Sequence, residues 1–181
     1  MGYALAQAAC KRSWQVDLVS GPVALTVPAG ATPTFVETAE EMRNVCLNLF
    51  SNCDLLLMAA AVCDHRPKSR SDRKLKKNQM SGILEMEPTP DILSELGTMN
   101  GQGQVLVGFA AETNDCEVNG EAKLREKNLD WIVVNEVGID GCGFAADTNT
   151  VTLIGKSGFS ESIGPAPKLE VAKLILERLY P

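Results

Sequence analysis

Short runs of apolar residues recur along this chain of 181 residues, and segments with helical spacing separate them. Three of these runs are nearly uninterrupted: Asp54–Val62, Gln104–Phe109 and Trp131–Val134. Apolar runs of this length are typical of strands that are buried on both faces of a sheet. Because strands that alternate with helices form parallel sheets covered on both sides, the pattern predicts an α/β fold with a mostly parallel sheet.

The other segments fit a Rossmann-like, doubly wound sheet in one domain that covers residues 1–181. Gly2–Arg12 and Ala166–Tyr180 have amphipathic helical spacing, and Thr38 with Glu41 predicts a capping box for a helix to about Phe50. A doubly wound domain normally opens with a strand and a glycine-rich turn, whereas this chain opens in a helix. We therefore expect the first strand and its turn to be missing, through truncation at the amino terminus.

Shorter signals predict the remaining elements. Strands are expected at Val16–Ser20, Thr34–Val36, Ile83–Met86 and Val151–Ile154. Thr89, Pro90 and Asp91 are expected to supply an N-cap, a first-turn proline and a first-turn acid for a helix to Leu96. Glu121–Lys127 belongs to another predicted helix. Ligands of such folds bind at the carboxyl ends of the strands, so the loops after Val62, Phe109 and Asn135 are the expected functional regions.

The composition excludes several classes of protein. Hydrophobic residues make up 45% of the chain, yet no apolar run approaches the roughly 20 residues that span a bilayer. Without a membrane span or a signal peptide, the expected location is the cytoplasm. Six cysteines and one histidine lack the spacing of zinc sites. The net charge of -6 argues against a broad nucleic-acid-binding surface.

One segment is strongly basic in spite of that net charge. Seven of the 17 basic residues lie between Arg66 and Lys77, directly after the apolar run that ends at Val62. Lys74 and Lys76 lie on one side of this segment if it is extended. Ammonium groups that converge at the end of a strand can attract and neutralise a polyphosphate. A solvated loop is the alternative, and the segment has no aromatic residue that could stack on a base of a nucleic acid.

Asp64, Phe109, Lys123 and Lys127 are further candidate site residues. Asp64 follows the apolar run and could meet a metal-bound phosphate, a ribose or a base, or could only form a turn. The ring of Phe109 could stack on a planar base or pack in the core. Lys123 and Lys127 are four residues apart and share a helical face. The glycines near position 101 do not form a dinucleotide motif, because they precede a strand and the pattern fails at Leu106.

Taken together, several segments resemble the phosphopantothenoylcysteine synthetase domain of bacterial coenzyme A biosynthesis, in that family's order. The matching segments are Val19–Val23, Ala60–Pro67, Lys74–Lys77, Pro90–Leu93, Val107–Thr113, Lys123–Leu124, Lys127–Asp130, Gly143–Phe144 and Asp147–Asn149. The resemblance implies a two-step ligase. CTP activates the carboxylate of 4′-phosphopantothenate as an acyl-cytidylate and releases pyrophosphate. The amine of cysteine then displaces CMP and forms an amide.

The resemblance also implies the residues, cofactors and partners of the site. Lys74 would be the catalytic residue. The residues that contact CTP would be Met58, Ala59, Ala60, Asp64, Lys74, Pro90, Asp91, Ile92, Leu93, Phe109, Lys123 and Lys127. Mg²⁺ would accompany CTP, FMN would belong only to a fused decarboxylase domain, and the protein would be a homodimer.

The chain also departs from that family, because the family's amino-terminal part does not occur in this sequence. In the family, that part helps to bind the phosphates of the nucleotide and the acyl intermediate. An inactive fragment of the domain is therefore one alternative. A Rossmann-type oxidoreductase is a second, although Tyr3 and Tyr180 do not fit the Tyr-x-x-x-Lys pair of short-chain dehydrogenases. An RNA-binding module built on the basic segment is a third, and binding that falls steeply with salt would indicate it.

Overall fold

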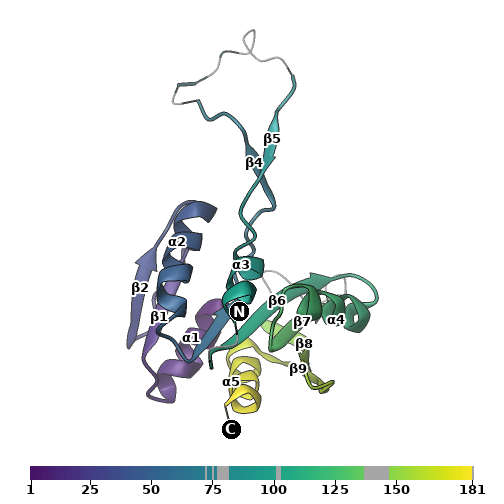
Figure 1. Cartoon of the computed structure of the whole chain (residues 1–181). Helices are drawn as coiled ribbons and strands as arrows, with labels where there is room; N and C mark the ends of the chain where they lie inside the picture. Colours follow the sequence, from purple (N-terminus) through teal and green to yellow (C-terminus); the bar gives the residue numbers. More distant parts are fainter. Residues whose placement is uncertain (72, 75, 77–81, 101–102, 137–146, 181) are drawn as a thin grey trace.

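A five-stranded sheet forms the middle layer of the molecule (Figure 1). The computed structural model describes residues 1–71, 73–74, 76, 82–100, 103–136 and 147–180. The strands, in their spatial order, are β3 (Leu55–Met58), β6 (Val105–Glu112), β7 (Trp131–Glu136), β8 (Thr148–Gly155) and β9 (Ser160–Pro167). The first three are parallel, while β8 and β9 are antiparallel to their neighbours.

This sheet confirms the α/β prediction but corrects two details. The run Asp54–Val62 forms a strand only over Leu55–Met58, because its ladder with β6 ends at the pair Met58 and Gly108. Within the described residues β3 has one neighbour, so its side chains are half-buried rather than covered on both faces. β9 was not predicted, since its glycine, prolines and serines give no apolar signal.

A second, smaller sheet contains β1 (Val16–Ser20) and β2 (Ala31–Phe35), which are parallel. Within the part of the chain that the structure describes, no ladder joins β1 to β3. A doubly wound sheet normally has another strand at such a position. The described part of the chain therefore contains two separate parallel ladders, β1 with β2 and β3 with β6.

Helices cover both faces of the large sheet, and each face has its own apolar core. α1 (Gly2–Lys11) and α5 (Lys168–Leu179) contribute Leu5, Val171 and Ile175 to one core. α2 (Ala39–Phe50), α3 (Ile92–Met99) and α4 (Cys116–Glu126) cover the other face, where Phe50, Leu96 and Leu124 are buried. This three-layer arrangement confirms the doubly wound architecture.

Helix boundaries follow local chemistry. Thr38 accepts a hydrogen bond from the Glu41 amide, and the Glu41 carboxylate accepts one from the Thr38 amide, which confirms the predicted capping box of α2. α4 begins at Cys116 and contains most of the predicted Glu121–Lys127 segment, with Lys127 as its C-cap. α5 begins at Lys168, because the two residues before it belong to β9. No helix of the described residues is long and apolar enough to cross a bilayer.

Two short antiparallel strands, β4 (His65–Pro67) and β5 (Met86–Pro88), form an arm that projects away from the layers (Figure 1). The predicted strand Ile83–Met86 is wrong in position, because β5 starts where the chain pairs with β4. Arg66 Nε lies 2.8 Å from Glu87 Oε1 across this pairing. Lys68 also has a carboxylate partner, Glu85, at 3.7 Å. Two of the basic residues of the Arg66–Lys77 segment are therefore paired within the arm.

Candidate active site

The carboxyl ends of β3 and β6 lie at the same edge of the sheet, because these strands are parallel. Met58 is the last residue of β3, so Ala59 and Ala60 leave the sheet at this edge. Asp64 lies at the base of the arm, where its carbonyl oxygen accepts a hydrogen bond of 2.9 Å from the Thr89 amide. This bond brings the two ends of the arm together beside the start of α3.

Asp91, and not Thr89 as predicted, is the N-cap of α3. Its Oδ1 accepts a hydrogen bond of 3.0 Å from the Ser94 amide, which satisfies one of the free donors of the first turn. Thr89 instead donates from Oγ1 to the carbonyl oxygen of Cys63 at the base of the arm. Pro90 and Asp91 therefore precede α3 rather than belong to its first turn.

Lys127 pairs with the same Asp91 carboxylate. Its Nζ lies 3.0 Å from Oδ1 and 2.8 Å from Oδ2, although the two residues are 36 positions apart in sequence. The C-cap position of Lys127 at the end of α4 and the N-cap of α3 thus meet on one face of the sheet. The structure brings together two residues of the predicted CTP site, and each is the ion-pair partner of the other.

The Asp91 carboxylate makes the stability of the protein depend on pH. Partial burial alone would raise its pKa, but the hydrogen bonds from Lys127 and the Ser94 amide lower the pKa below the usual value. A carboxylate with a lowered pKa stabilises the fold above its unfolded pKa, and this contribution is lost as the pH falls through the folded pKa. We therefore expect the unfolding free energy to decrease below about pH 4.

Asp91→Asn tests this expectation, because asparagine is an equally good N-cap without the charge. At pH 7 we expect the variant to be less stable by up to about 1 kcal/mol, since the pair is partly exposed. The difference should shrink in urea unfolding at pH 3. An equal difference at both pH values would show that the charge of Asp91 contributes nothing.

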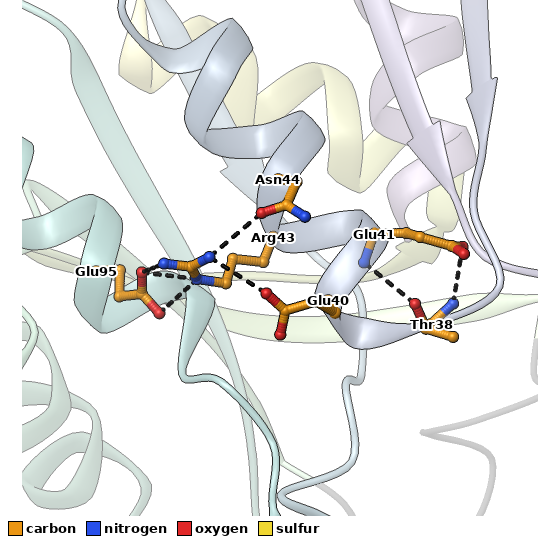
Figure 2. Close-up of polar contacts among 6 residues, drawn as sticks. All are labelled: Thr38, Glu40, Glu41, Arg43, Asn44 and Glu95. Carbon is orange, nitrogen blue, oxygen red and sulfur yellow. Dashed lines mark hydrogen bonds and ion pairs between the residues drawn. The ribbon is translucent and has the colours of Figure 1, made fainter.

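Arg43 links α2 to α3 from the other side (Figure 2). Its Nη2 lies 2.7 Å from Glu95 Oε2, and its Nε lies 2.8 Å from the same oxygen. Nη1 donates to Glu40 and Asn44 on α2 itself. The hydrogen bonds from Arg43 lower the pKa of Glu95. This network fixes the position of α3, and hence of the Pro90–Leu93 turn, relative to α2.

A second lysine, Lys123, pairs with Glu112 at the carboxyl end of β6. Lys123 Nζ lies 2.6 Å from Glu112 Oε1, and Asn119 Nδ2 donates to Oε2 at 3.3 Å. The Glu112 side chain is only 13% exposed, while that of Lys123 is 46% exposed. The lysine therefore reaches solvent at the edge of the sheet while its partner lies almost covered.

Several other residues that were predicted to contact CTP have side chains that pack in the apolar cores. Ile92 is 2% exposed, and Leu93 and Met58 pack against the same core, so their side chains are parts of that core. Phe109 lies within β6 and not at its exit, opposite Val133, and packs on the α1 and α5 side. Its half-buried ring is thus on the opposite face of the sheet from Asp91.

Lys74 lies in the arm, in the part of the chain between β4 and β5. Lys74 and Lys76 are exposed, and no described contact joins Lys74 to Asp91, Phe109, Lys123 or Lys127. Leu75 and Lys77 of the predicted basic motif, and the matching segment Gly143–Phe144, lie outside the described residues. The catalytic role of Lys74 remains a prediction.

Three charged side chains that hold the site in place were not predicted from the sequence: Arg43, Glu95 and Glu112. Glu112 was within reach, since it lies in the segment Val107–Thr113 that carries part of the family resemblance. Its partner Lys123 lies 11 residues further on, so only the packing of α4 on β6 reveals the pair. The Arg43 and Glu95 pair spans 52 residues and had no local signal.

Comparisons with known sequences show which proteins the chain is similar to. The model of the DNA/pantothenate metabolism flavoprotein C-terminal domain matches residues 1–181. A coenzyme A biosynthesis bifunctional protein CoaBC of Bacillus subtilis is 44% identical over 180 residues, which are 99% of this chain and 44% of the relative. A protein described as a cysteine/cysteine sulfinic acid decarboxylase, from an unknown prokaryotic organism, is 40% identical over 99% of this chain and 50% of its own length. The chain thus spans about half the length of these relatives.

Solved structures show the same fold. The crystal structure of the C-terminal domain of a CoaBC protein is 37% identical, with a TM-score of 0.82 over 98% of this chain and 79% of that one. The DNA/pantothenate metabolism flavoprotein from Streptococcus pneumoniae is 16% identical, with a TM-score of 0.78 over 98% of this chain and 85% of that one, and supports the fold alone. The chain therefore belongs to the family of the DNA/pantothenate metabolism flavoprotein C-terminal domain.

Proposed function

We propose that this domain joins 4′-phosphopantothenate to cysteine in coenzyme A biosynthesis, with CTP as the source of energy. The observation that carries the proposal is the match of almost the whole chain to the C-terminal domain of a CoaBC protein, with a TM-score of 0.82. The two lysine–carboxylate pairs at the carboxyl edge support it, because this edge is the ligand-binding edge of doubly wound sheets.

The proposed reaction has two steps. A carboxylate oxygen of 4′-phosphopantothenate attacks the α-phosphorus of CTP, and pyrophosphate leaves with the electrons of the broken P–O bond. The cysteine amine then attacks the acyl carbon and loses a proton, and CMP leaves. The first step brings two anions together, so cations that bind more strongly in the transition state than in the ground state accelerate it. Lys74 is the proposed cation beside the α-phosphate.

Mg²⁺ is the proposed metal, and it would come with the nucleotide. Among the described residues there is no group of three or more histidine, cysteine, aspartate or glutamate side chains that could hold an ion. Magnesium in nucleotide-dependent enzymes is commonly bound by substrate phosphates with one or two carboxylates. The triphosphate oxygens would therefore supply most of its ligands.

A comparison of nucleotides tests the CTP dependence separately from the ligase activity. Purified protein, 4′-phosphopantothenate and magnesium are incubated with CTP, ATP, GTP or UTP, and released pyrophosphate is measured. We expect release with CTP at least about tenfold above the others, which is within reach of a few directional hydrogen bonds. Equal release with ATP would contradict the CTP dependence but not the ligase, whereas no release with any nucleotide would contradict both.

A homodimer formed through the arm is also proposed. Isolated two-stranded hairpins are marginal in water, yet the arm carries Ile83 and Leu84 at 79% and 67% exposure. Burial of these side chains against a second copy would stabilise the arm. Light scattering should give twice the chain mass for the wild type and the single-chain mass for Leu84→Asp. The same mass for Leu84→Asp and the wild type would contradict an interface on the arm.

A further inference from the structure

The Glu112 and Lys123 pair differs in one respect from the other ion pairs of α4. The carboxylate is 13% exposed and receives hydrogen bonds from two side chains, Lys123 at 2.6 Å and Asn119 at 3.3 Å. Asn119 is itself held by the carbonyl oxygen of Asn114, at 3.0 Å. Glu121 and Arg125 on the same helix form an ordinary surface pair, with side chains that are 49% and 72% exposed. Glu112 is therefore held in place, and it holds the ammonium group in turn.

The pair has little net charge but retains hydrogen-bonding capacity. A lysine ammonium group has three donors, and in the described contacts one of them is directed at Glu112. The remaining donors belong to a group that is 46% exposed at the carboxyl edge of the sheet. An ammonium group already neutralised by a carboxylate 2.6 Å away adds little attraction for a triphosphate, because the carboxylate repels the same phosphates. It can still donate to an uncharged oxygen.

The cations of the arm have the opposite character. Lys74 and Lys76 are exposed, and among the described residues neither has a carboxylate partner. Unpaired ammonium groups are suited to phosphate charge. The molecule thus has two kinds of lysine: Lys74 and Lys76 on the arm, which have no carboxylate partner among the described residues, and the two lysines at α4, each of which pairs with a carboxylate. Of these two pairs, only that of Lys123 has a covered carboxylate and an exposed lysine, since Asp91 is 53% exposed and Lys127 25%.

From this contrast we infer that Glu112 is a positioning residue, which holds Lys123 so that it donates to an uncharged oxygen of the nucleoside, a base carbonyl or a ribose hydroxyl. The inference rests on the proposed function and deepens it, because it assigns the nucleoside to α4 and leaves the phosphates to the arm. A long lysine side chain loses considerable rotamer freedom when it binds a ligand. Since the Glu112 carboxylate already fixes the ammonium group, that loss has occurred before the nucleotide arrives.

Uncharged cytidine separates this role from phosphate binding. Dissociation constants of CTP and cytidine are measured for the wild type, Glu112→Gln, Lys123→Gln and the double variant, with cytidine in competition with CTP. Glutamine has the shape of glutamate, so Glu112→Gln removes the charge and leaves the packing. We expect Glu112→Gln to weaken cytidine about tenfold, the scale of a hydrogen bond to a charged group. Lys123→Gln should cause a similar loss, and the double variant should lose no more than Lys123→Gln alone.

Glu121→Gln is the matched control, because it removes an ion pair from the same helix away from the sheet edge. It should bind cytidine and CTP as the wild type does. Thermal unfolding of each variant separates a change of stability from a change of binding: Glu112→Gln and Glu121→Gln should unfold at similar temperatures and still differ in cytidine affinity.

Two results would overturn the inference. If Glu112→Gln binds cytidine as tightly as the wild type while its affinity for CTP changes, then Lys123 serves the phosphates. If the loss of the double variant equals the product of the two single losses, then the two residues act independently and not as a pair. Either result leaves the proposed function intact when the wild type releases pyrophosphate from CTP. A wild type that neither binds CTP nor releases pyrophosphate would overturn the proposed function together with the inference.

Discussion

Gly97→Ala is expected to lower the unfolding free energy by about 3 kcal/mol, the upper part of the range for overpacking a dense core. A Cβ atom at position 97 would lie 1.9 Å from the carbonyl oxygen of Lys127 and 2.9 Å from its carbonyl carbon. Both are backbone atoms, so no side chain can rotate to make room. The turn after α4 and the helix α3 would have to move apart.

Neighbouring contacts make that movement costly. Asn128 Nδ2 donates to the carbonyl oxygen of Gly97 at 2.8 Å, and Asn100 Nδ2 donates to the carbonyl oxygen of Asn128 at 2.9 Å. The backbone of Asn128 has a φ of 50°, a left-handed conformation that fixes the turn. A shift of this turn would also pull Lys127 away from Asp91. Gly97 therefore serves both the packing of α3 and the geometry of the candidate site.

Urea unfolding of Gly97→Ala and of Gly21→Ala measures the effect. A Cβ atom at Gly21 would meet nothing within 4 Å, so this control should change the unfolding free energy by less than about 0.5 kcal/mol. The midpoint of thermal unfolding of Gly97→Ala should fall by roughly 10 °C, the scale for a domain of this size. A loss below about 1 kcal/mol would show that α3 and the turn separate easily.

Lys74→Gln is expected to reduce the rate of pyrophosphate release by about 10²–10³, the usual effect of removing one directed charge contact with a transition state. Glutamine retains a hydrogen-bond donor but loses the positive charge that the attack of a carboxylate on a phosphate requires. The loss should appear in kcat more than in KM, because the contact is stronger in the transition state.

Lys68→Gln is the control on the same arm. Lys68 is 63% exposed like an ordinary surface lysine, and its partner is Glu85 at 3.7 Å. We expect its rate to stay within about threefold of the wild type, since exposed ion pairs contribute little. Equal rates for Lys74→Gln and the wild type would remove Lys74 from the catalytic step, and equal losses in both variants would indicate a general effect of arm charge.

Local patterns predicted much of the fold. The capping box of Thr38 and Glu41 predicted the amino end of α2 to the exact residue, because both of its hydrogen bonds lie within four residues. The apolar runs Gln104–Phe109 and Trp131–Val134 predicted β6 and β7, because a strand that is buried on both faces carries its apolar signal in its own residues. β9 and the arm were not predicted correctly, because their strands exist through pairing with distant partners and not through apolar content.

The candidate site was predicted as a set of residues but not as an arrangement. Lys123 and Lys127 were expected on one helical face, and each of them forms an ion pair with a carboxylate, of Glu112 and Asp91 respectively. The partners come from β6 and from the start of α3, which the sequence separates by 11 and 36 residues. Phe109 was expected at a strand exit, but the ladder with β7 continues to Glu112, so the ring lies deeper in the sheet.

The order of the two chemical steps tests the ligase account most directly. The chain as printed, and the chain joined to the remainder of the Bacillus subtilis relative that the match does not cover, are incubated with CTP, 4′-phosphopantothenate and magnesium, with and without cysteine. Pyrophosphate and products are followed by mass spectrometry. We predict that the joined protein releases pyrophosphate and forms the acyl-cytidylate without cysteine, and that cysteine converts this species to the amide and CMP. Absence of pyrophosphate from the joined protein under both conditions would contradict the account.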